Sequence, residues 1–504
     1  MREENNKSTQ DNKTTGEALI EERLKKLDEI KKEGINPYPY NYEITTNAKE
    51  IKEKYKDLEP QEKRDDEVSI AGRIILFRKM GKASFITLRQ DSGDIQVYIR
   101  RDDVGDREYE LIKKLDLGDF LGTKGTIFKT KMGEITVYAK EFKILCKTTK
   151  PLPDKYHGLQ DQELKYRKRH LDLIMNKESK EILTKRMQIL KHIREFLDER
   201  GFLEVETPIL HTIYGGAAAK PFKTHHNTLK MDLFLRISPE LYLKRLIVGG
   251  YEKVYDINKN FRNEGIDATH NPEFTMLELY QAYTDYNDMM KLTEELFEYV
   301  ALKINGTTKT KYKGKEIDLK APWARVTMLD SIKEHTGIDA STMGEDELKE
   351  FIQEKNVEFD AEENWGNFVL AIFEHFCEDK YDNPTFIIDH PEESTPLCKK
   401  HKEDPRLIER FEPFCCGAEL ANAYSELNDP IHQRKLLEDQ ARQLKEGNEE
   451  ANPIDEDFLE AIEQGMPPTG GLGIGIDRMA MIILGQESIR DILFFPTMKP
   501  EIKK

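Results

Sequence analysis

The sequence has no uninterrupted apolar run close to the ~20 residues that a membrane-spanning helix requires. Its beginning shows no apolar segment after the first charges and no arginine-rich, acid-poor amphipathic stretch, so it resembles neither a secretory nor a mitochondrial leader. Only five cysteines occur, with no Cys-x-x-Cys pair and no matching histidine spacing, which argues against a disulfide framework and a zinc site. We therefore expect a cytoplasmic protein with reduced thiols and no membrane association.

The charge is distributed unevenly along a chain long enough for about three domains. The 504 residues have a net charge of −17, yet residues 68–150 contain 17 Lys and Arg against 11 Asp and Glu. That excess of +6 leaves −23 for the rest of the chain. A basic module on an acidic body is consistent with one nucleic-acid-binding domain joined to a larger domain.

Residues 1–66 predict a polar tail followed by one amphipathic helix, which ends at Gly34 and Pro37. Residues 67–150 then alternate between turn sequences and short runs rich in β-branched and aromatic residues. The predicted strands are 69–77, 84–89, 94–99, 123–128 and 134–139. Five short strands of this kind predict a small β-barrel of the OB type. Its aromatic residues suit either a core or a surface on which bases stack.

The rest of the chain predicts an α+β fold. Prolines at 151 and 153 begin a linker that we place at 151–176, and a long amphipathic helix is expected over 177–200. From 177 to 504 strands and helices mix without sustained βαβ alternation, which disfavours a doubly wound parallel sheet.

Two familiar nucleotide-binding signatures are absent or imperfect. The run 471–476 has glycines at a Rossmann-like spacing but ends in Ile476, and no Gly-x-x-x-x-Gly-Lys-Ser/Thr loop occurs. Lys79-Met80-Gly81-Lys82 resembles a class I synthetase loop, but it lies within the predicted barrel and has no partner motif. We therefore look for a different kind of nucleotide site.

The segment 251–283 predicts a hairpin suited to that purpose. Arg262 and Glu264 are two residues apart, so in a strand both side chains project from one face. Arginine can bind a phosphate, an aromatic ring can stack on a base, and a carboxylate can accept from an exocyclic amine. A surface hairpin with ion pairs is the alternative. On the return strand the residues expected on a common face are Phe274, Met276, Glu278 and Tyr280.

Two later segments add charged groups. In 471–481 a glycine-rich strand leads into a helix, with Arg478 placed to reach a second phosphate. In 410–429, Glu412 and Glu419 supply the hard oxygen ligands that Mg²⁺ prefers, although acidic pairs at this spacing are also common on solvated surfaces.

These segments together resemble the class II aminoacyl-tRNA synthetases. Residues 201–208 resemble motif 1, residues 261–264 with 270–274 resemble motif 2, and residues 473–478 resemble motif 3, in the expected order. The similarity extends from about residue 67 to 498, and it is closest to the lysyl-tRNA synthetase family of subclass IIb. The segments that favour the lysyl family are 215–222, 239–244 and 419–428. Aspartyl and asparaginyl members share the layout but differ at Glu240 and Glu426.

The resemblance implies an OB-fold anticodon-binding domain at 67–150 and a class II catalytic domain at 177–504, built on an antiparallel sheet flanked by helices. Its motifs would lie near 177–208, 251–283 and 471–484. The implied reaction activates L-lysine with ATP and Mg²⁺ to lysyl-adenylate, then transfers lysine to the 3′-terminal adenosine of tRNA(Lys). The family also implies a homodimer formed through the motif 1 helix and strand.

The resemblance also implies roles for individual residues. Arg262 and Arg478 would be catalytic, and Glu412 and Glu419 would hold Mg²⁺. The ATP-binding residues would be Arg262, Glu264, His270, Asn271, Phe274 and Arg478. The lysine-binding residues would be Gly216, Glu240, Glu278, Tyr280, Asn422, Tyr424, Glu426 and Gly473. The anticodon-binding residues would be Arg78, Phe85 and Gln96.

Two alternatives stay open at this point. One is a related enzyme that lysylates a different acceptor, although such relatives typically lack the barrel. The other is a nucleic-acid-binding or scaffolding protein with an inactive catalytic domain. Loss of the arginine at 262 or 478 would favour the second alternative, and both arginines are present.

Overall fold

The computed structural model describes residues 2–153, 159–359 and 361–501. The chain divides into two compact units, Met1–Gly158 and Leu159–Lys504. None of the helices described has both the length and the apolar character that crossing a membrane demands.

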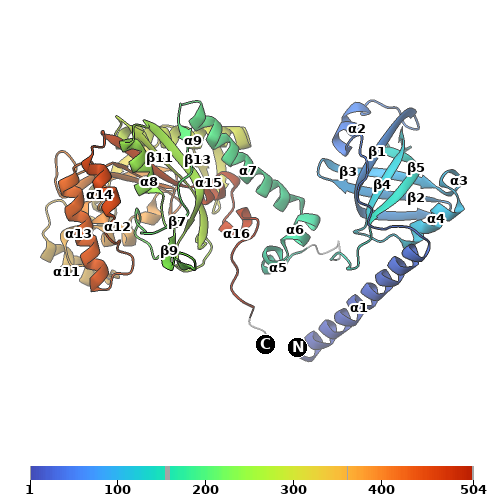
Figure 1. The fold of residues 1–504 in the computed structure, drawn as a ribbon, viewed down its shortest axis with the longest axis horizontal. Helices are drawn as coiled ribbons and strands as arrows, with labels where there is room; N and C mark the ends of the chain where they lie inside the picture. Colours follow the sequence, from blue (N-terminus) through green and yellow to red (C-terminus); the bar gives the residue numbers. More distant parts are fainter. Residues whose placement is uncertain (1, 154–158, 360, 502–504) are drawn as a thin grey trace. The chain divides into compact units, whose positions relative to one another are not determined.

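The first unit is a closed five-stranded barrel with strand order β1-β2-β3-β5-β4 (Figure 1). Alternate residues of each strand point inward, so that Ile86, Val97 and Val137 are fully buried. The OB-type barrel predicted from the sequence is confirmed. Its elements are α1 Arg2–Lys32, α2 Ala48–Lys54, β1 Lys63–Met80, β2 Ala83–Gln90, β3 Gly93–Arg100, α3 Arg101–Val104, α4 Asp106–Leu111, η1 Ile112–Lys114, β4 Phe120–Lys129 and β5 Ile135–Cys146.

Helix α1 begins at Arg2, so the polar tail predicted for the first residues is wrong. The carboxyl-terminal part of the helix is held against its own unit, where Arg23 donates to the carbonyl of Leu117 at 2.9 Å and Lys26 pairs with Asp116 at 2.7 Å. Helix formation is cooperative, so a turn fixed in this way favours extension toward the N-terminus when no proline intervenes. Figure 1 shows the helix extending away from the barrel.

The second unit is built on a nine-stranded sheet in the order β14-β15-β16-β18-β19-β11-β10-β6, with β17 paired to β16. The central pairs are antiparallel, and only the outer pairs β14–β15 and β10–β6 are parallel. The predicted α+β class is confirmed. The strands are β6 Leu203–Glu204, β7 Leu210–His211, β8 Lys223–His226, β9 Met231–Leu235, β10 Lys253–Phe261, β11 Glu273–Ala282, β12 Lys309–Tyr312, β13 Lys315–Asp318, β14 Ala324–Thr327, β15 Thr385–Pro391, β16 Leu407–Cys415, β17 Ala418–Glu419, β18 Ala421–Ser425 and β19 Thr469–Gly475.

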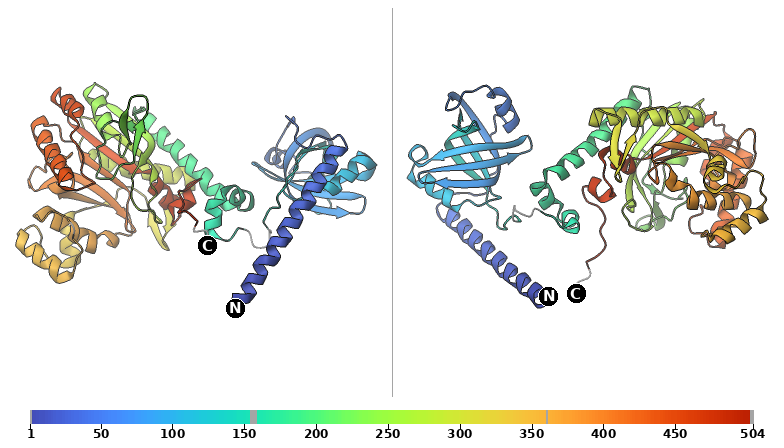
Figure 2. Two further views of the ribbon diagram at one scale, coloured as in Figure 1. Left: turned by 60° about the horizontal axis from the view of Figure 1, so that its bottom comes forward. Right: turned by 180° about the vertical axis from the view of Figure 1, so that it is seen from behind.

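Helices cover the two faces of this sheet differently. On one face α7, α9 and α15 bury the main core, to which Leu277 and Leu279 of β11 contribute (Figure 2). On the other face α8 and α14 pack only at one end, against Val254 and Tyr280. The helices are α5 Gln162–Arg167, α6 Arg169–Met175, α7 Lys177–Asp198, α8 Glu240–Val248, α9 Tyr286–Asn305, α10 Met328–Thr336, α11 Glu345–Lys355, α12 Trp365–Phe376, α13 Pro430–Glu446, α14 Glu456–Glu463, α15 Ile476–Leu484 and α16 Ile489–Ile492, with short turns η2 Glu378–Lys380 and η3 Glu392–Ser394.

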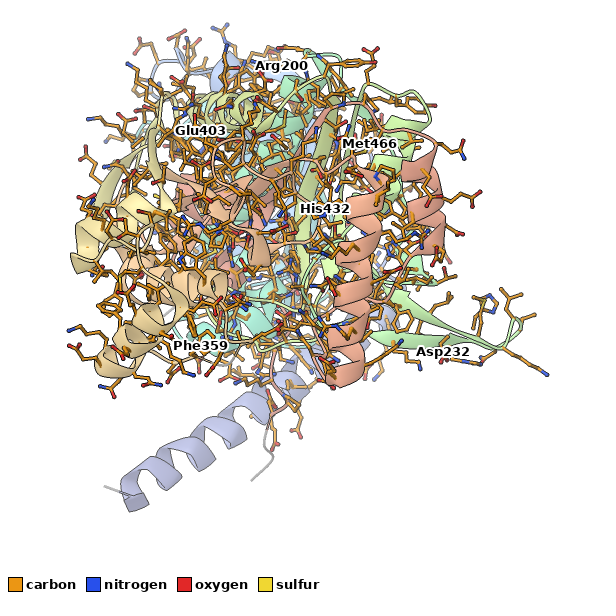
Figure 3. All side chains as sticks on the ribbon, turned by 90° about the vertical axis from the view of Figure 1, so that its left-hand side faces the viewer. Arg200, Asp232, Phe359, Glu403, His432 and Met466 are labelled. Carbon is orange, nitrogen blue, oxygen red and sulfur yellow. The ribbon has the colours of Figure 1, made fainter. Side chains whose placement is uncertain are left out.

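Two peripheral features complete this unit. Helices α10, α11 and α12 enclose a separate small core that includes Phe368 and Phe373. Figure 3 shows α13, with His432 on it, and the β8–β9 hairpin, which projects from the unit at Asp232.

The predicted linker, 151–176, is shorter in the structure because α5 and α6 belong to the second unit. Arg169 is only 2% exposed. Its guanidinium donates to the carbonyls of Arg490 at 2.7 Å, Leu493 at 2.9 Å and Phe494 at 2.9 Å. These bonds attach α6 to the carboxyl-terminal segment, and in α5 the hydroxyl of Tyr166 donates to Asp491 at 3.0 Å. Residues 154–158 of the predicted linker lie outside the described residues.

Candidate active site

Neighbouring strands bring together several of the residues that the family resemblance predicts to bind lysine. Glu278 of β11 lies opposite Gly473 of β19, which in turn lies opposite Asn422 of β18. Two residues away on each strand, Tyr280 of β11 and Tyr424 of β18 lie opposite Gly471 of β19, one on either side. Because alternate residues share a face, these two rows line one side of the sheet. The return-strand face predicted from the sequence is confirmed for Glu278 and Tyr280.

Three carboxylates converge on this side of the sheet. Glu240, the first residue of α8, is 3% exposed, Glu278 is 5% exposed and Glu426 is fully buried. The Nζ atom of Lys244 lies 2.6 Å from Glu240 Oε1 and 2.5 Å from Glu426 Oε2. Ser238 Oγ lies 3.0 Å from each carboxylate oxygen of Glu278 and can donate to one of them. Sequence reasoning missed Lys244 and Ser238.

The electrostatics of this pocket favour additional positive charge. Burial raises the pKa of Glu278 and of Glu426 to about 8, and it also raises the pKa of Glu240. Burial acts to lower the pKa of Lys244, but Glu240 and Glu426 raise it above its ordinary value, so Lys244 stays charged. Within the described residues, neither oxygen of Glu426 receives a well-directed hydrogen bond. Lys244 is thus the built-in cation that contacts two of these carboxyl groups, and Arg236 acts on the third, Glu278.

Glycines provide the space that these carboxylates need. A Cβ atom on Gly471 would lie 1.8 Å from Glu426 Oε1, so a larger residue would displace the carboxylate. Gly216 has a φ of +87°, and a Cβ there would approach Ser238 Oγ to 3.0 Å. At Gly473 the nearest atom to an added Cβ is the methyl of Met276, at 3.1 Å. The glycine-rich strand therefore accommodates pocket side chains as well as any ligand.

Arg262 supplies an unused donor beside the aromatic ring of Phe274. Its guanidinium lies 5.2 Å from the ring centroid. Its Nε is buried, and no described residue accepts a hydrogen bond from it. A buried donor without a partner is costly unless a ligand supplies the acceptor, and a phosphate oxygen would do so.

The predicted shared strand face of Arg262 and Glu264 is wrong. β10 ends at Phe261, and the backbone then turns into a loop in which Glu264 is exposed. The alternation of side chains therefore stops before either residue. Glu264 therefore lies in the loop, where a ligand can reach it.

Arg478 joins the motif 2 loop to the acidic segment. Its Nη2 lies 3.2 Å from His270 Nε2, and its Nη1 donates to the carbonyl of Glu419 at 2.8 Å and to Glu419 Oε2 at 3.1 Å. Asn271 lies in the same loop but has both ends of its amide in use, since it donates to the carbonyl of Glu273 and accepts from the amide of Thr497. His270 and Arg478 are therefore close together, whereas Asn271 supports the loop.

Glu412 and Glu419 lie in a carboxylate-rich region. Burial raises the pKa of Glu412 to about 7, against the effect of its partner Arg410 and with the help of Glu419, Glu378 and Glu374. In the described ranges no three His, Cys, Asp or Glu side chains form a ready metal cage. The donor set nevertheless fits a divalent cation held by two carboxylates together with a triphosphate, because added positive charge would relieve this repulsion.

An aromatic surface covers one side of the barrel. Phe85 lies opposite Arg78 on β1 and opposite Tyr98 on β3, and its ring is 4.7 Å from that of Tyr98. Tyr138 and Phe128 extend the cluster at 5.4 Å and 5.8 Å from Tyr98. Gln96, on the same face of β3 as Tyr98, accepts from Thr136 at 3.3 Å. The family resemblance predicts a role for Arg78, Phe85 and Gln96, and the structure adds Tyr138 and Phe128 to the same aromatic cluster.

Comparison with known proteins assigns both units. Residues 161–499 match the family model described as tRNA synthetases class II (D, K and N). The chain belongs to this family. Residues 68–145 match the model described as an OB-fold nucleic acid binding domain.

Three relatives of this class II synthetase share the name lysine–tRNA ligase. The protein from Pelotomaculum thermopropionicum is 53% identical over 485 residues, which cover 96% of this chain and 95% of the relative. That from Clostridium novyi is 52% identical, with coverage of 96% and 95%, and that from Carboxydothermus hydrogenoformans is 53% identical, with coverage of 96% and 98%.

In this class II synthetase a buried network joins the three motif segments. Arg186 of α7 donates to Asp477 at 2.7 Å and to the hydroxyl of Thr275 at 3.1 Å. Asp477 also accepts from the backbone amide of Thr275 at 2.9 Å. Since Asp477 precedes Arg478, this network fixes the base of the helix that presents Arg478 to the site.

Proposed function

We propose that this chain is a lysine–tRNA ligase that activates L-lysine with ATP and transfers it to tRNA(Lys). The observation that carries the proposal is the buried pocket of Glu240, Glu278 and Glu426, beside Tyr280. A lysine ammonium would pair with these carboxylates, whereas a neutral side chain of similar size would leave them buried and unpaired. The name shared by the relatives supports the same substrate.

In the first step, a carboxylate oxygen of lysine attacks the α-phosphorus of ATP. The bond between that phosphorus and the oxygen that bridges it to the β-phosphate breaks, and pyrophosphate leaves. Catalysis of such a transfer depends on positioning and charge stabilisation, so a general base is unnecessary. Arg262 would bind the α-phosphate with its unused Nε donor. Phe274 and Arg478 would enclose the adenine, and Glu264 would accept from its amine.

The remaining groups would bind the far end of the nucleotide. His270 and Arg478, 3.2 Å apart, would contact the γ-phosphate. Glu412 and Glu419 would hold Mg²⁺, which supplies charge neutralisation for the departing pyrophosphate when bound. In the second step a hydroxyl of the terminal adenosine attacks the activated carbonyl and AMP leaves.

The barrel would read the anticodon of tRNA(Lys). Unpaired bases stack on aromatic side chains and form hydrogen bonds at their edges. Phe85 would stack on a base, with Arg78 opposite it on β1 and with Gln96 opposite Thr87, two residues along β2, to contact base edges.

A Phe85→Ala substitution is expected to reduce kcat/KM for tRNA charging about 10- to 100-fold, from the loss of one stacked base. Lysine-dependent pyrophosphate exchange without tRNA should be unchanged. Steady-state charging assays measure the effect, with Tyr40→Ala, at a fully exposed aromatic residue of the same unit, as the control. A parallel loss of pyrophosphate exchange would contradict a role confined to tRNA recognition.

We also propose that the protein is a homodimer formed around the motif 1 strand. Leu203 and Leu210 are 49% and 48% exposed, and a groove of about 540 Å³ is lined by residues 206–210 and Asn258. Large apolar side chains exposed along this segment and its groove are costly in water and favour a second copy.

A Leu203→Glu/Leu210→Glu double variant is expected to shift the protein from dimer to monomer at micromolar concentration, because each introduced charge would be desolvated in the interface. Sedimentation velocity measures the change. Leu229→Glu, at a residue 63% exposed in the turn after β8, should leave the dimer intact. A dimer that persists in the double variant would place the interface elsewhere.

Charging of tRNA(Lys) with radiolabelled lysine tests the complete function. Periodate-oxidised tRNA, which lacks the 3′-terminal diol, is the matched control. Activation of lysine without charging of any tRNA would instead favour the alternative of a different acceptor. A tRNA-charging enzyme acts where proteins are synthesised, so we propose the cytoplasm as its compartment.

A further inference from the structure

Lys244 is an internal cation in the lysine pocket. It follows Glu240 by one helical turn on α8, it is fully buried, and its ammonium contacts both Glu240 and Glu426. The centroid of the Phe458 ring on α14 lies 6.0 Å from Nζ, so the side of the ammonium that faces α14 has apolar surroundings. The cation is therefore built into the site and is not a surface ion pair.

The other polar groups that face this cluster come from several elements. Glu278 and Tyr280 approach from β11, Tyr424 from β18, and Cys398 from the segment bridged to Glu426. Two arginines also act on these groups, because Arg236 opposes the raised pKa of Glu278 and Arg410 opposes that of Cys398 and Tyr424, whereas Lys244 is the cation that contacts Glu240 and Glu426. Glu240 and Glu426 therefore repel each other and Glu278 wherever Lys244 does not intervene.

We propose that Lys244 is a positioning residue for lysine activation: its ammonium fixes the carboxylates of Glu240 and Glu426 and offsets their repulsion, so that both can be negatively charged when lysine binds. The inference rests on the proposed function and adds a residue to it. In the pocket, the Lys244 ammonium lies between the carboxyl groups of Glu240 and Glu426, which come from two different parts of the chain. The ammonium at the end of the substrate side chain would bind these same carboxylates, so their position and ionisation affect how tightly lysine binds.

The burial of these carboxyl groups explains why the Lys244 ammonium assists a site that itself binds an ammonium group. Glu240 and Glu426 are destabilised as anions by burial, and Lys244 is the group that opposes this effect on both. Without it both carboxyls would hold protons more tightly, and substrate lysine would have to displace those protons. Lysine binding would then depend more steeply on pH, with the largest loss at neutral and acidic pH.

The test is the pH dependence of the KM for lysine in ATP–pyrophosphate exchange by the full-length enzyme. A Lys244→Met variant should raise this KM about tenfold at pH 7, equivalent to one pKa unit on an essential carboxylate, with a much smaller increase at pH 9. Its KM for ATP and its kcat at saturating lysine should change less than about threefold. Arg245→Met is the matched control, because it removes one positive charge from the next position of α8, where Arg245 pairs with Asp455.

A Lys244→Arg variant separates charge from geometry. It keeps the charge, so the shape of the pH profile should be that of the parent, but its larger planar head would displace the carboxylates and raise the KM for lysine at every pH. If Lys244→Met fails to fold, as judged by circular dichroism and ATP binding, Lys244→Arg still tests the positioning role of Lys244. A parent-like KM in Lys244→Arg would then overturn the positioning role.

The outcomes distinguish this inference from the proposed function. If the parent does not exchange pyrophosphate with lysine, the proposed function fails. If the parent does so, but Lys244→Met loses activity equally at all pH values or keeps the parent profile, the proposed function stands and the role of Lys244 is overturned.

Discussion

A Glu240→Gln variant is expected to activate lysine with a kcat/KM about 10²- to 10³-fold below that of the parent. Removing one partner of a buried, hydrogen-bonded charge pair costs roughly 2–5 kcal/mol, and each 1.4 kcal/mol corresponds to a factor of ten. Glutamine keeps the size of the side chain and removes the charge. Lys244 still contacts Glu426 at 2.5 Å, so the pocket should keep its fold.

The matched control is Glu252→Gln, the same chemical change at an exposed residue between α8 and β10. Both variants should unfold thermally within a few degrees of the parent. If Glu240→Gln activated lysine at the parent rate, the assignment of Glu240 to substrate recognition would be wrong. If it failed to fold, its role would be structural.

An Arg262→Gln variant is expected to lower kcat for adenylate formation about 10²- to 10³-fold, with a smaller change in the KM for lysine. The buried Nε of Arg262 has no acceptor among the described residues and would gain one from the α-phosphate. Loss of one donor that stabilises transition-state charge has an effect of this size, and it appears in kcat when the contact strengthens only in the transition state.

Single-turnover formation of lysyl-adenylate measures this effect free of product release. Lys259→Gln is the control, since Lys259 lies on β10 three residues before Arg262 and pairs at 3.6 Å with Glu273. An increase in the KM for ATP alone, with kcat unchanged, would show that Arg262 binds the ground state and the transition state equally.

The sequence was most informative where one periodicity applied over a whole element. The five barrel strands were predicted within a few residues of their bounds, apart from the longer β1 and β5, and the helix predicted at 177–200 is α7, Lys177–Asp198. Alternation along β11 correctly placed Glu278 and Tyr280 on one face. Local patterns of this kind depend on backbone geometry, so they are visible without tertiary structure.

The sequence failed where a local pattern gave no sign of its tertiary partner. Glu240 and Lys244 are four residues apart on a helix, a spacing typical of a solvated ion pair. Only the approach of Glu426, which directly follows β18, makes their contact part of a buried pocket. Likewise, the space at Gly471 suggested a ligand, but the group that it accommodates is the carboxylate of Glu426.

Element boundaries were the other source of error. The loop after Phe261 ended the alternation on which the pairing of Arg262 with Glu264 depended. The part of the linker that became α5 and α6 is held by Arg169, whose carbonyl acceptors lie more than 300 residues away in the sequence. Contacts of such long range leave no local pattern.

The most direct test of the account is ATP–pyrophosphate exchange with each of the twenty amino acids in turn, without tRNA. The pocket of Glu240, Glu278 and Glu426 predicts exchange with lysine alone, because only lysine supplies a side-chain ammonium of the right length. Exchange with aspartate or asparagine in place of lysine would keep the fold and contradict the assignment of the pocket. Exchange with no amino acid would favour a binding protein with an inactive catalytic domain.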